Sequence, residues 1–325
     1  MEAVALHVAA VVIGIGLLFL ALVRLNAAFD TAAQARLDQL LAGLQGIGGL
    51  STALSAGLLA TMLTQSSSAV IIIAVVAAGR SAISLETGMF VVLGANVGST
   101  VTGHLMTLQP PLAVDFALLL LGSLLELTAH PARRATPTPT RSLGAGLEGV
   151  GLLFAALTVV TRSLEPLARQ PWFLAAFATV AQQPLLAWCS GVLLTSAVFS
   201  SGLTIGLLQQ LAAAHALDIS QALPILLGDN VGTTTDTLLA ALGTGTAGRR
   251  LAIFHLLFNV ALAFVYAPFS AVLGADGTTA LLAALSGDPA RQVALAHSAL
   301  NMAGALAVIA TRRLWLQLLG RMWQE

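Results

Sequence analysis

The sequence predicts an all-α polytopic membrane protein built from two homologous repeats. Three observations predict this class: the composition, a series of long apolar runs, and motifs that recur at one spacing. Of the 325 residues, 57% are hydrophobic and only 9% are charged, whereas a soluble domain usually carries about 25% charged residues. The mean hydropathy is +0.91, so a bilayer rather than water must cover much of this chain.

Apolar runs cover residues 5–23, 47–79, 88–108, 112–129, 143–161, 173–214, 219–242, 251–273 and 292–310. Most of them have the length of about 20 residues that spans a bilayer. The first exceeds the roughly 7–15 apolar residues of a signal peptide, so we expect a membrane helix there. Runs 47–79 and 173–214 are too long for one helix, and polar residues interrupt both. We therefore predict a broken or re-entrant helical hairpin in each, because irregular backbone at membrane depth occurs only in buried or cavity-lining positions.

Two segments lack the composition of a membrane span. Residues 29–44 place apolar side chains along one helical side and polar ones along another, which predicts a helix lying at the membrane interface. Residues 131–142 are rich in Pro and Arg, and we interpret them as a polar linker on the cytoplasmic side. This linker divides a first transmembrane repeat, residues 1–130, from a second repeat with additional C-terminal helices, residues 143–325.

An internal repeat is the strongest signal in the sequence. The string Gly14–Phe19 recurs at Gly149–Phe154 with an offset of 135 residues. Three further matches follow at an offset of 134: Gly57 with Gly191, Ser66-Ser67 with Ser200-Ser201, and Gly94–Gly98 with Gly228–Gly232. Duplicated halves with polar breaks at equivalent positions predict a transport site between the repeats. We expect the repeats to be inverted, although the distribution of arginines leaves their orientation open.

The first polar break holds one amide and three hydroxyls in a row, Gln65, Ser66, Ser67 and Ser68. Buried polar groups without partners cost about 1–3 kcal/mol each, so this cluster needs a ligand, an ion or mutual contacts. Hydroxyl oxygens suit a hard cation such as sodium. Hydroxyls and the free N–H groups of a half-helix N-terminus suit an oxyanion. We predict that these residues and their second-half counterparts, Ser200 and Ser201, bind substrate.

The two Gly-x-Asn strings form the second group of candidates. Their glycines permit a broken helix and close approach of the backbone, and we predict that Asn96 and Asn230 contact the substrate. The predicted sodium ligands are the nearby oxygen-bearing residues Ser68, Thr100, Asp229, Thr233 and Thr234.

Asp229 and Asp236 stand where the first half has Ala95 and Thr102. Carboxylates within a membrane are costly and usually functional, either as ion ligands or as proton carriers. A structural ion pair, for example with Arg249, is the alternative for this pair of acids.

Six other polar residues have weaker functional signals. His255 and Asn259, like His297 and Asn301, are four residues apart and share a helix face; a satisfied core histidine is the favoured interpretation for both. Glu126 and Glu148 lie near the ends of spans, and we interpret them as solvated or interfacial groups.

The strings at 65–69 and 94–100, with their second-half partners, resemble those of the type II sodium-dependent phosphate cotransporters and their bacterial Na/Pi relatives. The resemblance covers nearly the whole chain and implies that Gln65–Ser68 and Ser200-Ser201 together hold phosphate and sodium. This chain departs from the family pattern in the second half, where Phe199 and Gly202 flank the two serines. Compared with the family pattern, the second half of this chain lacks one amide and one hydroxyl and has the carboxylate of Asp229. The identity of the transported anion is therefore left open.

The function expected from these motifs is sodium-coupled transport of inorganic phosphate across a bacterial inner membrane. The alternatives are a carrier of another small anion, a proton-coupled carrier, and a non-transporting membrane subunit. An enzyme is not expected, because the chain has neither a His-Glu-x-x-His string nor a nucleophile elbow. A formal net charge of zero argues against a nucleic-acid partner, and assembly of several copies in the bilayer is left open.

Overall fold

The computed structural model is α-helical throughout its described part. It describes residues 4–21, 24, 49–108, 112–128, 139–168, 170–172, 175, 179 and 183–322. The predicted interfacial helix at 29–44 lies outside these residues, as does 131–138 of the predicted linker. Residues 139–142 of that linker are instead helical, because the helix that follows begins at Pro139.

Within the described part, five helices are long and apolar enough to cross a membrane. They are Val4–Ala21, Leu85–Met106, Leu143–Val160, Thr246–Phe264 and Pro289–Ala310. Large apolar side chains lie on the outside, with Leu185 and Phe264 each 74% exposed. Side chains of this kind are stable at a protein surface that faces lipid, which agrees with the predicted membrane class.

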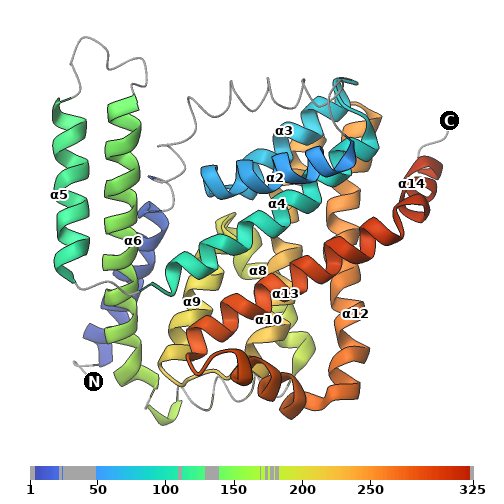
Figure 1. Ribbon diagram of the computed structural model, residues 1–325. Helices are drawn as coiled ribbons and strands as arrows, with labels where there is room; N and C mark the ends of the chain where they lie inside the picture. The colour runs from blue at the N-terminus through green and yellow to red at the C-terminus, as the bar shows by residue number, and fades with distance from the viewer. Residues whose placement is uncertain are drawn as a thin grey trace.

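Figure 1 shows how the helices are arranged. Their bounds are α2 Leu50–Thr64, α3 Ser67–Gly79, α4 Leu85–Met106, α5 Leu112–Thr128, α6 Pro139–Ala168, α8 Pro184–Val198, α9 Ser201–Ala213, α10 Ile219–Gly232, α11 Thr234–Ala241, α12 Thr246–Leu285, α13 Pro289–Ala310 and α14 Arg312–Arg321. Helices α5 and α6 stand side by side at one side of the molecule, and α13 crosses the other helices on its way to α14.

Both predicted breaks are present. Helix α2 ends at Thr64 and α3 begins at Ser67, while α8 ends at Val198 and α9 begins at Ser201. The two arms have the same lengths in each case, 15 residues before the break and 13 after it. The same local structure therefore occurs twice along the chain.

Close backbone packing fixes each first arm against the helix that follows the hairpin. A Cβ atom added to Gly57 of α2 would lie 2.1 Å from the Val91 carbonyl oxygen of α4. Gly191 of α8 has the same relation to the Ile225 carbonyl oxygen of α10, also at 2.1 Å. Only glycine permits this approach, because any side chain would overlap the neighbouring backbone.

The Gly-x-Asn strings do not break their helices in the way that their glycines suggested. Helix α4 runs without interruption through Gly94–Thr100. The second string ends α10 at Gly232, but Thr233 keeps near-helical angles (φ −62°, ψ −17°) before α11 begins. The glycines serve close packing instead: an added Cβ on Gly94 or Gly228 would lie 2.0 Å from a carbonyl oxygen of the facing arm.

Substituting Gly191 by Ala is expected to lower stability by about 1–3 kcal/mol, the usual cost of overpacking. The new methyl group would meet the Ile225 carbonyl oxygen at 2.1 Å, and backbone cannot move aside as a flexible side chain can. Gly16→Ala is the matched control, since no atom lies within 4 Å of an added Cβ there. Thermal unfolding of the purified protein in detergent measures both; equal losses would contradict the packing argument.

Candidate functional site

The first break is organised around Gln65. This residue adopts left-handed backbone angles (φ 53°) just after α2. Its side-chain amide donates to the Met62 carbonyl at 2.5 Å, and its side-chain oxygen accepts from the Thr102 hydroxyl of α4 at 2.7 Å. Ser66 then caps α3 by accepting the Ala69 N–H at 3.2 Å. Gln65 is thus held from two sides at the point where the helix stops.

Ser67 and Ser68 form the first turn of α3 and are half-buried. The first N–H groups of a helix have no intrahelical partner, and the helix dipole favours an anion near them. The Ser68 side chain lies close to the carboxyl group of Asp236, which belongs to α11 in the second half of the chain. This contact joins the first polar break to the second half.

The second break repeats the backbone of the first with different side chains. Phe199 takes the left-handed position (φ 51°) that Gln65 occupies, and its side chain is 52% exposed. Ser200 caps α9 by accepting the Leu203 N–H at 3.3 Å, and Ser201 begins the helix. The sequence match between the two serine pairs therefore reflects the same cap in the same place.

Asp229 forms a hydrogen-bonded group with two threonines, Thr195 and Thr204. One carboxylate oxygen accepts from the Thr195 hydroxyl at 2.6 Å, and Thr195 lies 2.7 Å from the Thr204 hydroxyl. All three residues are fully buried, and the other Asp229 oxygen has no hydrogen-bond partner among the described residues. The matching residues of the first half are Thr61, Val70 and Ala95, of which only Thr61 is polar.

Sequence reasoning identified Asp229 but missed Thr195 and Thr204. Two threonines nine residues apart in an apolar run are usually packing residues. The signal that could have identified these threonines was Asp229 itself, because a buried carboxylate requires hydrogen-bond donors nearby.

The two asparagines have different surroundings. The Asn230 side-chain oxygen lies 3.2 Å from a ring nitrogen of His297 on α13, whereas the Asn96 side chain donates to the Val92 carbonyl of its own helix at 3.1 Å. His297 thereby contacts a predicted substrate residue. The prediction of a satisfied core histidine is wrong for His255, since neither of its buried ring nitrogens has a hydrogen-bond partner within the described part of the chain.

The three threonines among the predicted sodium ligands each donate to the backbone carbonyl three residues earlier. Thr100 donates to the Val97 carbonyl at 2.8 Å, and Thr234 donates to the Val231 carbonyl at 2.7 Å. Thr233 donates in the same way to Asn230 at 2.7 Å. Each hydroxyl oxygen keeps lone pairs for a cation, because donation uses only its hydrogen. No group of three His, Cys, Asp or Glu side chains suited to a metal occurs among the described residues.

Two other sequence interpretations change. Asp236 does not pair with Arg249, which donates to the Leu242 carbonyl at 3.5 Å and is exposed. Glu126 and Glu148 are more than solvated end groups, since both pair with Arg24, Glu126 at 3.6 Å. This three-residue ion pair links the segment after the N-terminal helix to α5 and α6.

Helices interrupted by polar residues within an all-helical, lipid-facing chain are characteristic of membrane transport proteins. The sequence model of the Na+/Pi-cotransporter family matches residues 17–162 and again residues 156–269. These matches cover most of the chain, which therefore belongs to the Na+/Pi-cotransporter family.

Three relatives illustrate the range of the similarity. YqeW of Bacillus subtilis, an uncharacterized protein, is 27% identical over 80% of both chains. YjbB of Escherichia coli, provisionally named as an inorganic phosphate export protein, is 25% identical over 67% of this chain and 39% of its own length. Human sodium-dependent phosphate transport protein 2C is 36% identical over 23% of this chain and 13% of its own. No solved structure matches the chain.

Replacing Thr195 by Val is expected to destabilise the protein by about 1–3 kcal/mol. The substitution removes the only hydrogen-bond donor to the buried Asp229 carboxylate in the described part of the structure, and an unsatisfied buried polar group carries about that cost. Thr61→Val is the matched control from the first half, because the buried Thr61 hydroxyl has no partner to lose. Thermal unfolding of both variants checks this; a larger loss for Thr61→Val would contradict it.

Proposed function

We propose that this chain is a secondary transporter that moves inorganic phosphate across the membrane together with sodium. Membership of the Na+/Pi-cotransporter family supports phosphate as substrate. The YjbB and human 2C relatives carry names that describe phosphate export and sodium-dependent phosphate transport respectively. We further propose that the two halves are inverted repeats and that the site lies between them near the bilayer midplane.

The contact that carries this proposal is the one between Ser68 and Asp236. It joins the serine motif of the first break to α11, the helix that follows the second Gly-x-Asn string. A reciprocal contact runs the other way, since the Gln209 side chain of α9 donates to the Gly103 carbonyl of α4 at 2.7 Å. Asp236 of the second half thus contacts α3, and Gly103 of the first half contacts α9. Such contacts are expected for a site between repeats.

The chemistry of the two breaks suits an oxyanion. The N-termini of α3 and α9 offer backbone N–H groups, and Ser67, Ser68 and Ser201 offer hydroxyl donors beside them. Phosphate binds favourably where hydroxyls and a helix N-terminus act together. Gln65 adds a firmly positioned amide to the first half alone.

Sodium coupling is supported by the acids close to these groups. Two unit charges about 4 Å apart interact by about 4 kcal/mol at an effective dielectric constant of 20. An ionised Asp229 would therefore weaken phosphate binding unless a cation lay nearby. Asp229, the hydroxyls of Thr195 and Thr204, and the neighbouring Asn230 provide the oxygens that such a cation prefers.

A proton-coupled carrier is the second candidate, and one observation favours it. Asp229 is fully buried and one of its oxygens has no hydrogen-bond partner. A carboxyl group in this state could hold a proton and release it during transport. The two candidates differ in what the acid binds, so they can be separated by experiment.

Gln65→Ala is expected to lower phosphate flux by at least about tenfold, which corresponds to the loss of roughly 1.4 kcal/mol of binding. The residue is bonded on two sides at the first break, so truncation removes an ordered amide. Radiolabelled phosphate uptake into proteoliposomes, with and without an inward sodium gradient, measures the effect. Gln317→Ala on the exposed face of α14 is the control. Unchanged flux in Gln65→Ala would indicate that Gln65 has a purely structural role.

Asp229→Ala is expected to raise the sodium concentration needed for half-maximal flux while leaving the pH profile nearly unchanged. The reason is the loss of the one charged oxygen ligand in that group. Asp229→Asn should behave similarly if charge matters more than shape. Flux measured over a grid of sodium concentrations and pH values decides the question. A flattened pH profile with normal sodium dependence would establish the proton-coupled alternative.

A further inference from the structure

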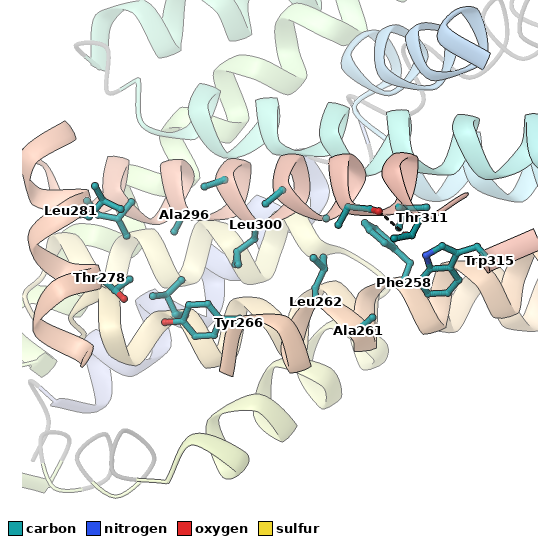
Figure 2. A pocket seen from close by; sticks show the side chains of 17 residues that line it. Phe258, Ala261, Leu262, Tyr266, Thr278, Leu281, Ala296, Leu300, Thr311 and Trp315 are labelled. Atoms are coloured by element: carbon teal, nitrogen blue, oxygen red, sulfur yellow. Dashed lines mark hydrogen bonds between the residues drawn. The ribbon is translucent and has the colours of Figure 1, made fainter. Parts of the chain in front are cut away.

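An apolar groove runs between α12 and α13 (Figure 2), and none of its lining residues belongs to either polar break. Its volume is about 510 Å³, which falls within the roughly 300–1,000 Å³ typical of sites for small organic ligands. Ala299, Ala303 and Ala307 give α13 a row of small side chains, and Leu262 and Leu281 of α12 face them. The lining is almost entirely apolar, so an occupant must be apolar along most of its length.

One end of the groove is different. Thr311 and Trp315 close it, and Thr311 also lines a second hollow of about 360 Å³ that includes Arg312 and Arg313. Arg312 pairs with Glu86 at 3.4 Å. Arg313 is exposed, and none of the ion pairs in the described part of the chain includes it. Two arginines thus follow directly after the residue at which the apolar groove ends, and one of them has no ion-pair partner in the described part of the chain.

This end lies where a membrane interface is expected. Helix α13 is one of the candidate spans and ends at Ala310, so the residues after it leave the hydrocarbon region. Helix α14 carries arginines at both ends and Trp315 between them, and tryptophan is enriched at the level of lipid headgroups. The short α14 thus has the character of a helix that lies along the interface.

Other arginines gather at the same end of the molecule. The Arg250 side chain of α12 donates to the Met322 carbonyl just after α14 at 2.6 Å. Gly245, just before α12, approaches the backbone of Gly79 at the end of α3. Arg80, Arg249 and Arg250 therefore share this end with the α14 arginines. An end of the molecule that is rich in arginine attracts anionic lipid headgroups.

We propose that the groove binds an anionic phospholipid, with an acyl chain between α12 and α13 and the phosphate-bearing headgroup against Arg313 and Arg312. The apolar walls fit the chain, and the guanidinium pair fits the phosphate, to which arginine donates two parallel hydrogen bonds. A zwitterionic lipid would fill the same walls but would leave the excess positive charge uncompensated. This inference is independent of the transported substrate.

Photolabelling of the full chain tests the proposal. The protein is reconstituted in phosphatidylcholine vesicles that contain a trace of phosphatidylglycerol with a photoactivatable acyl chain, or of phosphatidylcholine with the same chain. Peptide mapping then locates the labels. We expect the phosphatidylglycerol probe to label the groove face of α13 about fivefold more, the factor that corresponds to roughly 1 kcal/mol for one arginine.

Three variants complete the test. Arg313→Gln should reduce groove labelling by phosphatidylglycerol to the phosphatidylcholine level, while Arg321→Gln, which removes the same charge from the other end of α14, should leave it unchanged. Ala303→Phe should fill the groove and reduce labelling there by both probes. Equal labelling by the two headgroups, equal loss in the two arginine variants, or full labelling in Ala303→Phe would each overturn the proposal. Size-exclusion profiles and thermal unfolding establish that each variant is folded.

Discussion

A helix that stops inside an apolar layer leaves backbone groups without partners, and this constraint determines how the two breaks are built. Water cannot satisfy those groups in a bilayer, so the protein must. Ser66 and Ser200 cap the helices that restart, and Gln65 and Phe199 take the left-handed turn before them. The arms are held by glycine contacts that bring Gly57 against the backbone of the next helix. The polar cluster at the first break is thus held in place by the caps and by close helix packing.

The same framework carries different chemistry in its two copies. Gln65 and Thr102 share a neutral hydrogen bond in the first half, where the second half has Phe199 and Asp236. Thr195 binds a carboxylate, whereas its counterpart Thr61 has no partner. The backbone arrangement is therefore the same at the two breaks, while the side chains differ. At these matched positions the first half has uncharged side chains, whereas the second half has the carboxyl groups of Asp229 and Asp236.

The positions of both breaks could be predicted from the sequence. Burying a cluster of polar residues inside a long apolar run costs free energy unless the helix stops there or the residues find hydrogen-bond partners. Sequence reasoning failed where tertiary packing decides. Gly94 and Gly98 suggested an interruption, yet α4 continues through them. A glycine within a helix costs only about 1 kcal/mol, which close packing offsets. The contact between Ser68 and Asp236 joins residues far apart in the chain, so no local pattern could reveal it. Arg249 was a reasonable partner for Asp236 by sequence distance but faces outward.

The length of α12 gives Gly274 an unexpected importance. Forty residues of straight helix would extend about 60 Å, twice the roughly 30 Å of a hydrocarbon core. Gly274 interrupts the helix with φ 70° and ψ 167°, a region essentially closed to other residues. No atom lies within 4 Å of an added Cβ there, so the restriction is conformational and not steric crowding. Tyr266 before this elbow and Thr278 after it line the same groove. The backbone angles of a single residue thus set how far the two limbs of α12 open toward the lipid.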